Sequence, residues 1–287
     1  MAQSLVDGAV DEGRRDEDRF GFGANWQQFL DRVDERRVGL AVDALRDLLA
    51  VDSLQGKSFL DIGSGSGLSS LAAHRLGAVV HSFDFDANSV AASREMKRRF
   101  AHGDSGWTIE AGSALDNAYL SGLGRFDVVY SWGVLHHTGE MWRSFEYVGE
   151  RVLPGGLLAL AIYNDQGPVS NRWRWIKRSY VRQRWLRPLL VSGSLVTIWG
   201  PTTLRDFGRL RPFSSWRHYG AIRGMSAWHD LVDWVGGYPF EVATPDAIFA
   251  YFHARGFSLQ RLITRQGRGC NEFVFRRVAA GSDSTTT

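Results

Sequence analysis

An apolar run that breaks into three alternating glycines is the feature that most restricts the fold of this chain. Residues 59–73 read Phe-Leu-Asp-Ile-Gly-Ser-Gly-Ser-Gly-Leu-Ser-Ser-Leu-Ala-Ala, a pattern typical of a buried strand, a tight turn and a helix. Gly63, Gly65 and Gly67 lack the Cβ atoms that keep a ligand away from the backbone, and the helix that follows begins with N–H groups that have no acceptor in the helix. The stretch therefore predicts a nucleotide-like ligand on the turn.

The glycine spacing fits the dinucleotide-binding fingerprint poorly. That fingerprint has a small residue three places after its second glycine, and this position holds Leu68 in one register and Ser70 in the other. An acidic residue two places before the first glycine completes the pattern Asp-x-Gly-x-Gly-x-Gly, which resembles motif I of the class I S-adenosylmethionine (SAM) methyltransferases. The resemblance implies that SAM is the cofactor and that the methionine half of SAM lies beside Asp61, Gly63, Gly65 and Gly67.

A second acidic residue stands where a nucleotide ribose is expected. Residues 78–86, Ala-Val-Val-His-Ser-Phe-Asp-Phe-Asp, read as a buried strand that ends in acid. A carboxylate at this end of the strand can accept hydrogen bonds from both ribose hydroxyls. We therefore assign Asp84 to the ribose and Phe85 to the adenine face. Asp86 is better placed than Asp84 to cap the helix expected over residues 87–100.

The loop after the third strand, which begins at Trp107, is implied by the same resemblance to meet the adenine. In the family an Asp usually binds the exocyclic amine and a backbone N–H binds the ring. Here Ser113 stands at the usual Asp position. Its hydroxyl can still accept the amine hydrogen, and Ala114 can still present its N–H.

Residues 126–139, Phe-Asp-Val-Val-Tyr-Ser-Trp-Gly-Val-Leu-His-His-Thr-Gly, form the second informative stretch. They are similar to motif IV of the branch that includes the ubiquinone-biosynthesis O-methyltransferases, which implies that Ser131 and Trp132 lie beside the SAM methionine. His136 and His137 are the only paired histidines, and a neutral imidazole can take a proton near pH 7. One of them is a candidate general base, and the alternative is that they only bond backbone or shape the pocket.

Strand and helix patterns that alternate along the chain predict the fold class. The order implies an α/β fold with a doubly wound, Rossmann-like sheet of seven strands, mostly parallel, closed by an antiparallel hairpin at 256–264 and 271–278. An α-helical insertion follows the fifth strand, residues 153–163. The expected parts are a disordered arm (1–19), an N-terminal helical layer (20–54), a SAM-binding core (55–165), a helical cap (166–240), the C-terminal part of the core (241–278) and a disordered tail (279–287).

Aromatic residues and glycines precede a helical pattern near the N-terminus. Apolar positions from Phe29 to Leu49 continue one helical face, so a helical layer is expected to pack on the core. In many class I methyltransferases such a layer closes over SAM, which makes Asn25 and Trp26 candidate lid residues. A Trp26 that only staples the helix is equally open.

The insertion is basic and rich in tryptophan. From Asp165 to Gly224 there are 12 Lys and Arg residues against 2 Asp residues. Interleaving such as Arg-Trp-Arg-Trp-Ile-Lys-Arg-Ser-Tyr at 172–180 can indicate nucleic-acid stacking, an interfacial membrane helix, or helix packing with basic residues outward, and the last is favoured. In residues 225–241 a histidine with neighbouring carboxylates, His229, is a second candidate base, although a purely structural polar helix is also open. The expected substrate contacts are Tyr163, Asn164, Trp228, Asp230 and Tyr238.

Composition excludes several other classes. The single Cys270 cannot form an intrachain disulfide and the first residues form no apolar leader, so a cytoplasmic protein is expected. The apolar stretch 189–199 is too short and too interrupted to span a membrane. The net charge of +3 is too small to indicate nucleic acid by itself, and the paired histidines lack a carboxylate cluster, so no metal is expected. A homodimer is compatible with the chain.

The sequence thus predicts a SAM-dependent methyltransferase acting on an oxygen or nitrogen of a small molecule, with a histidine that removes the acceptor proton. Three alternatives remain. The same fold can consume SAM itself, by an intramolecular attack that releases methylthioadenosine. The basic insertion can serve an RNA or DNA methyltransferase, although the chain lacks an Asn/Asp-Pro-Pro-Tyr/Phe tetrapeptide after its fourth strand. The chain can also bind SAM without catalysis.

Overall fold

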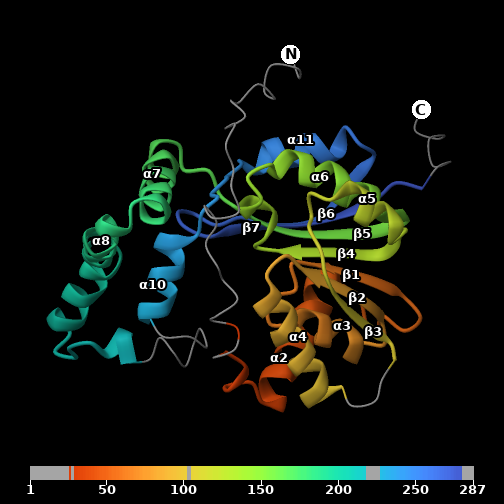
Figure 1. Cartoon of the computed structure of the whole chain (residues 1–287), viewed down its shortest axis with the longest axis horizontal. Coiled ribbons are helices and arrows are strands. Elements are labelled where there is room, and N and C mark those ends of the chain that lie inside the picture. The colour runs from red at the N-terminus through yellow and green to blue at the C-terminus, as the bar shows by residue number, and fades with distance from the viewer. Residues whose placement is uncertain (1–25, 27–28, 102–104, 218–226, 280–287) are drawn as a thin grey trace.

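The computed structural model is built around one seven-stranded sheet (Figure 1). It describes residues 26, 29–101, 105–217 and 227–279. The strand order is β3-β2-β1-β4-β5-β7-β6. The strands are β1 (Ser58–Ile62), β2 (Val79–Asp84), β3 (Trp107–Ala111), β4 (Phe126–Trp132), β5 (Val152–Tyr163), β6 (Phe257–Ile263) and β7 (Cys270–Arg277).

The first five strands are parallel, and β7 lies antiparallel between β5 and β6. Strand β1 is buried along nearly its whole length because it has neighbours on both sides and helices on both faces. From β1 the sheet extends through β2 and β3 on one side and through β4 and β5 on the other, so the strand order reverses between β1 and β4. Open α/β sheets bind their ligands at such a point. The predicted doubly wound sheet with a closing antiparallel hairpin is confirmed.

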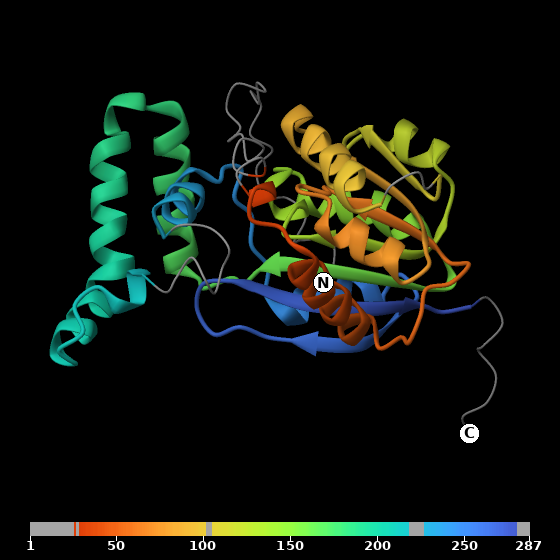
Figure 2. The ribbon, with the colours of Figure 1, turned by 90° about the horizontal axis from the view of Figure 1, so that it is seen from below.

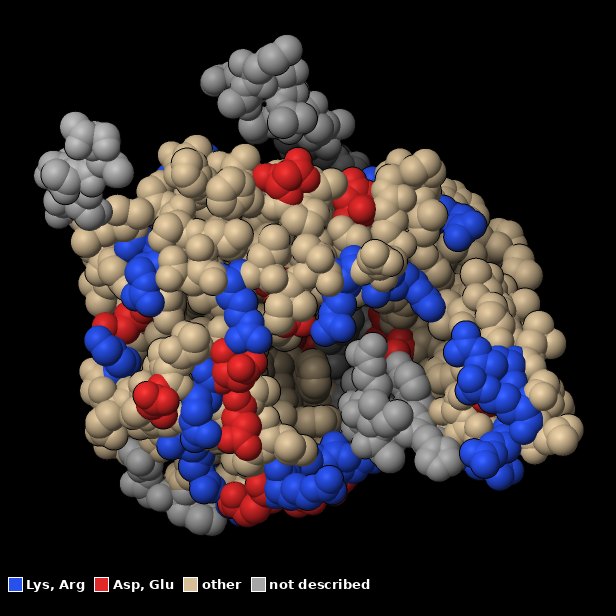
Figure 3. All heavy atoms as spheres, turned by 180° about the vertical axis from the view of Figure 1, so that it is seen from behind, with Lys and Arg blue, Asp and Glu red and all other residues tan. Residues whose placement is uncertain are grey.

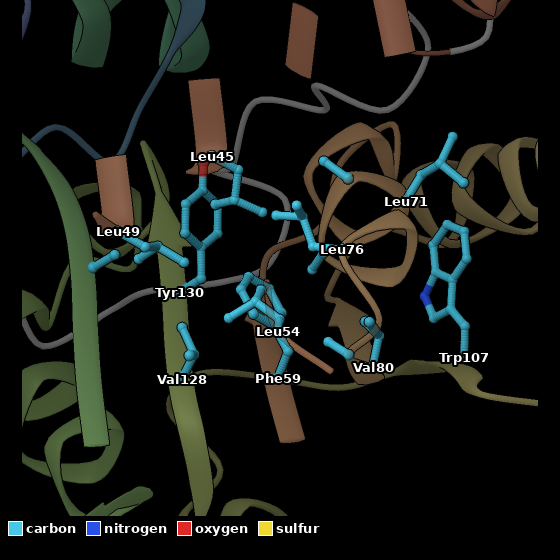
Figure 4. Packing of buried hydrophobic residues seen from close by; sticks show 14 of the residues in the cluster. Leu45, Leu49, Leu54, Phe59, Leu71, Leu76, Val80, Trp107, Val128 and Tyr130 are labelled. Carbon is cyan, nitrogen blue, oxygen red and sulfur yellow. The ribbon is translucent and has the colours of Figure 1, made fainter. Parts of the chain in front are cut away.

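Helices cover both faces of the sheet. One layer holds α2 (Glu35–Leu49), α3 (Leu68–Arg75) and α4 (Ala87–Phe100), and the other holds α5 (Asn117–Gly122), α6 (Met141–Glu150) and α11 (Pro245–His253) (Figure 1). Under the first layer, Leu45 and Leu49 of α2 lie beside Tyr130 of β4, and Leu71 of α3 lies beside Trp107 of β3 (Figure 4). The second layer buries a separate aromatic cluster that includes Phe145, Phe252 and Phe275.

Aspartate side chains cap the starts of α2, α4 and α5. The carboxylate of Asp86 accepts from the N–H of Asn88 at 2.8 Å, which confirms the expected cap of α4. The single helical face expected from Phe29 to Leu49 is wrong in part. A turn follows Leu30, and Asp34 caps a new helix by accepting from the N–H of Arg37, so α2 begins only at Glu35.

The insertion after β5 forms the predicted helical cap. It consists of α7 (Pro168–Arg182), a short 3-10 helix η4 (Arg184–Leu186), α8 (Arg187–Gly208) and α10 (Ala227–Gly236), and it projects from one end of the sheet (Figures 1 and 2). A third apolar cluster, with Trp173, Leu231, Val235 and Phe240 at its centre, joins these helices to Tyr163. None of the helices among the described residues is long and apolar enough to cross a membrane.

Candidate active site

The glycine turn between β1 and α3 is tightly enclosed. Gly63 has φ +78°, and a Cβ atom built on it would lie 2.5 Å from the side chain of Val134. At Gly65, with φ +54°, a Cβ atom would lie 3.0 Å from the indole of Trp26. Both positions thus require glycine, because the backbone is left-handed and neighbouring side chains approach it closely. Trp26 therefore lies over the turn, where the sequence placed a lid residue, whereas Asn25 lies outside the described residues.

Two carboxylates converge on this turn from neighbouring strands. Asp84 accepts from the N–H of Gly65 and from the N–H of Asp86, each at 2.9 Å, and burial raises its pKa above the ordinary value. Asp61 is 2% exposed and accepts from the hydroxyl of Ser70 at 2.5 Å. Burial raises the pKa of Asp61 to about 7, opposed by the Ser70 hydrogen bond and assisted by the charge of Asp84.

These residues fit SAM. A buried carboxylate with a raised pKa is stabilised by a nearby positive charge, and SAM carries both an ammonium and a sulfonium group. The glycine turn would hold the methionine half beside Asp61, and Asp84 would hold the ribose hydroxyls. Phe85, which is 55% exposed next to Asp84, stands where a side chain could cover the adenine.

The remaining predicted cofactor residues use their side chains locally. Ser113 accepts from the N–H of Leu115 at 3.2 Å, and Ala114 is buried beside it. Ser131 is fully buried and its hydroxyl donates to the carbonyl of Ile62 at 3.0 Å, which ties β4 to β1. Trp132 stacks on Tyr130 with ring centroids 5.4 Å apart. Their contacts with SAM stay predictions, and for Ser131 such a contact would involve its backbone.

The paired histidines lie in the 3-10 helix η3 (Leu135–His137), next to the end of β5. The ring of His136 is fully buried, 3.9 Å by centroids from Tyr163, and its Nε2 has no hydrogen-bond partner among the described residues. His137 lies edge-on to Tyr163 at 5.4 Å. Its Nδ1 is 2.7 Å from the carbonyl oxygen of Pro239, and because a carbonyl only accepts, Nδ1 carries the proton.

Burial keeps both imidazoles neutral. Desolvation lowers the pKa of His136 well below its ordinary value, with a further contribution from the charges of His137 and Lys177. Desolvation and the charge of Lys177 lower the pKa of His137 to about 3, although its bond to Pro239 acts in the opposite direction. Each ring therefore stays uncharged at physiological pH, and the neutral Nδ1–H form of His137 leaves Nε2 as its basic nitrogen.

A cavity of about 490 Å³ lies where the cap meets the sheet. Its walls come from the end of β5, from α8 and α10, and from the hairpin between β6 and β7. Aromatic rings and charged groups share the lining, which consists of Tyr163, Ile198, Trp199, Thr202, Asp230, Leu231, Asp233, Trp234, Arg268 and Cys270. The volume lies within the range that small-molecule sites occupy.

The structure brings only some of the predicted substrate residues to this cavity. Tyr163 and Asp230 line it. Asn164 instead bonds the β6–β7 hairpin, through Arg265 and Asn271, and Trp228 is half exposed on α10. Tyr238 precedes Pro239 at a cis peptide bond and is absent from the lining that the structure describes. The backbone of His229 lies in α10, but its side chain lies outside the described part of the chain, so its role stays a prediction.

Lys177 is a buried group that the sequence analysis missed. Its side chain is fully buried under α10, and Nζ donates to the carbonyl of Trp234. The same ammonium lies over the rings of Trp234 and Phe240, at 4.3 and 4.8 Å from their centroids. Burial lowers the pKa of Lys177 to about 7, against the charge of Asp233. The helical spacing of the sequence could have revealed that Lys177 is buried, because Lys177 follows the buried Trp173 by four residues and so lies on the same, inward side of α7.

Within the described residues no group of three or more His, Cys, Asp or Glu side chains is arranged to hold a metal ion. The ionisable groups of the described site belong to three parts: the glycine turn, the neutral histidine pair and the cavity wall. Val134 lies against Gly63 and leads directly into η3, and the histidine rings contact Tyr163, which lines the cavity. The histidine pair thus lies close to both the glycine turn and the cavity wall.

Comparison with known proteins agrees with this geometry. Residues 60–158 match a family described as a methyltransferase domain. A ubiquinone biosynthesis O-methyltransferase of Cereibacter sphaeroides is 32% identical over 156 residues, which cover 54% of this chain and 60% of the relative. One from Chelativorans sp. is 30% identical over 120 residues, 42% of this chain and 45% of the relative. The match to these curated relatives thus spans about half of their length.

Solved structures share the fold. The magnesium protoporphyrin IX methyltransferase of Synechocystis PCC 6803, with bound S-adenosylhomocysteine (SAH), has a TM-score of 0.53 at 16% identity, over 89% of this chain and 94% of the other. An O-methyltransferase family protein from Burkholderia thailandensis also reaches 0.53, at 13% identity, over 90% and 60% of the two chains. The glycine turn and the two carboxylates thus lie in a region that matches a methyltransferase domain, on a fold shared with a methyltransferase that binds SAH, and SAM is the cofactor.

Proposed function

We propose that this chain transfers a methyl group from SAM to an oxygen or nitrogen of a small molecule held in the cap cavity. The observation that carries the proposal is the position of the cavity. It lies at the end of β5, where Tyr163 in its wall contacts His136, and Val134, two residues before His136, packs against the glycine turn. When bound, SAM supplies an electrophilic methyl group. The similarity to enzymes named ubiquinone biosynthesis O-methyltransferases supports a small-molecule acceptor without identifying it.

The residues of the chain would act mainly by positioning. Tyr163, Trp199 and Trp234 offer flat apolar walls that exclude water from the acceptor. Holding two reactants in a productive geometry can supply most of the rate of such a transfer. Asp230 and Asp233 offer carboxylate oxygens that accept hydrogen bonds from acceptor hydroxyl or amino groups.

His137 is the proposed proton acceptor. Its bond to Pro239 fixes the ring and the tautomer, so that Nε2 can take the proton that leaves the acceptor as the new bond forms. Burial keeps the imidazole neutral, so that Nε2 holds a lone pair for this proton, although the low pKa makes the ring a weak base.

In the test, the protein is incubated with SAM and, in turn, with each of a panel of phenols, catechols, anilines and aliphatic amines. SAH and the methylated product are detected by mass spectrometry. Thr202→Phe fills the cavity from α8 and is expected to reduce turnover at least tenfold while the Kd for SAM stays unchanged. Thr197→Phe is the matched control, because Thr197 is exposed on the same helix and absent from the cavity lining. Equal turnover in the two variants would show that the acceptor does not bind in this cavity.

Product identity separates the proposal from its strongest alternative. SAH formed only when an acceptor is present supports methyl transfer. Methylthioadenosine formed from SAM alone, with turnover, would show that SAM is itself the substrate.

A further inference from the structure

The outward side of α8 carries a stripe of large apolar side chains. Leu189, Val196, Leu204 and Phe207 are 68%, 70%, 74% and 51% exposed. Their spacing, with Gly193 and Gly200 between them, follows one side of an α-helix. We call these four residues the outer stripe.

The opposite side of the same helix is already used. Ile198 and Thr202 line the cavity, and Val191 is buried in the cap. Helix α8 therefore has two apolar sides, and core packing accounts for only one of them.

Further exposed apolar residues lie at both ends of α8, and the ring of Phe213 contacts that of Phe207 in the stripe. Trp185, in η4, is 78% exposed, and Leu210 and Phe213, just after the helix, are 90% and 47% exposed. Isolated exposed apolar residues are ordinary, but a continuous group of this kind on one face usually marks an interaction surface.

The charge around the outer stripe has one sign. Within residues 166–217 the only acid is Asp206, which is buried and accepts from the N–H and hydroxyl of Ser215. The basic residues of the same segment are Arg172, Arg174, Lys177, Arg178, Arg182, Arg184, Arg187, Arg205, Arg209, Arg211 and Arg217. Figure 3 shows basic side chains gathered on the cap, at the lower right. Since residues 188–204 contain no charge, the arginines flank the stripe at both ends.

We infer that the outer face of the cap docks onto an anionic phospholipid bilayer, with α8 lying along the surface. The outer stripe would enter the apolar boundary of the bilayer, and exposed arginines such as Arg184, Arg205 and Arg209 would contact lipid phosphates. An aromatic side chain at each end, Trp185 and Phe213, suits the interface between headgroups and acyl chains.

Charge and polarity favour this occupant over two others. A nucleic acid offers phosphates, but its backbone gives no apolar layer for Leu189, Val196 and Leu204. A second copy of the chain would bring arginines against arginines in either direction, because both ends of α8 are basic. An anionic bilayer satisfies the apolar stripe and the flanking charge together.

The experiment measures co-sedimentation of the full chain with vesicles. We expect binding to phosphatidylcholine vesicles that contain phosphatidylglycerol, and little binding to phosphatidylcholine alone. Val196→Asp combined with Leu204→Asp should weaken binding at least tenfold. Arg209→Gln and Arg211→Gln should weaken it about fivefold per arginine, an effect that high salt also produces.

Matched controls come from α2, on the core. Leu40→Asp replaces an apolar residue that is 58% exposed, and Arg36→Gln removes an exposed arginine. Both should bind vesicles like the wild type. An unchanged Kd for SAM and an unchanged circular dichroism spectrum would show that the α8 variants are folded.

Three results would overturn the inference. The first is absence of binding to the anionic vesicles, or binding that the α8 variants leave unchanged. The second is a salt-dependent shift with RNA that is tighter than vesicle binding. The third is a dimer in analytical ultracentrifugation that Leu204→Asp converts to a monomer, which would assign the stripe to a second copy. None of these readouts depends on methyl transfer, so the docking surface and the proposed activity fail separately.

Discussion

Asp84 illustrates how a single side chain organises the cofactor site. One of its oxygens holds the N–H of Gly65 and the other holds the N–H of Asp86, so it fixes the glycine turn and the start of α4 together. Burial raises its pKa, which means that the folded chain tolerates the carboxylate charge with difficulty in the absence of a ligand. Hydrogen-bond donors on a nucleotide ribose would relieve that strain.

Asp84→Asn is therefore expected to weaken SAM binding. A hydrogen bond to a charged acceptor contributes about 2 kcal/mol, so the Kd measured by titration calorimetry should rise roughly thirtyfold. Asp86→Asn provides the control, because asparagine caps a helix as well as aspartate does and SAM affinity should hardly change. Similar affinities for the two variants would contradict the assignment of Asp84.

Among the elements, the turn from β1 to α3 is the most constrained. Gly63 and Gly155 have the same φ, +78°, but their surroundings differ. A Cβ atom at Gly63 would meet Val134 at 2.5 Å, whereas nothing lies within 4 Å of one at Gly155. The comparison of the two positions separates backbone strain from crowding.

Gly155→Ala should lower the free energy of unfolding by about 1–2 kcal/mol, from the left-handed backbone alone. Gly63→Ala should lower it further, because Val134 must also move, and should weaken SAM binding since the turn is displaced. Urea denaturation measures the first effect and calorimetry the second. If the Gly63→Ala and Gly155→Ala variants lost the same stability and bound SAM equally well, Val134 would be able to move away from the new Cβ atom at no cost in free energy.

At the scale of the whole molecule, the histidine pair makes stability depend on pH. An ordinary histidine has a pKa of 6.5, and burial lowers that of His137 to about 3 in the folded chain. Between these values the unfolded chain binds more protons than the folded chain, so stability is fully present above pH 6.5 and falls as the pH falls toward 3.

At pH 5 this single group should reduce the free energy of unfolding by about 2 kcal/mol. Urea denaturation at pH 7.5 and pH 5.0 should therefore show a smaller loss for His137→Gln than for the wild type. The variant His253→Gln, which removes an exposed histidine from α11, serves as the control and should lose as much as the wild type. An equal loss for His137→Gln would show that His137 is not buried as neutral imidazole.

The sequence by itself determined the sheet, the glycine turn and the resemblance to SAM-dependent methyltransferases. Strand and helix periods, glycine positions and the placement of Asp61 and Asp84 are local, because each depends on backbone conformation and on burial along one element. Even the cap of α4 by Asp86 follows from neighbouring residues. The break before α2 was missed since Asp34 interrupts an apolar pattern that still looks helical.

Only the tertiary structure decided which distant residues meet at the cavity. Trp199 and Thr202 come from α8, Trp234 from α10 and Arg268 from the β6–β7 hairpin, and no local pattern relates these segments. The same holds for Lys177, whose charge is buried because α10 and Phe240 close over α7. Long-range packing fixes such groups, and a sequence pattern records only the side of the helix on which each one lies.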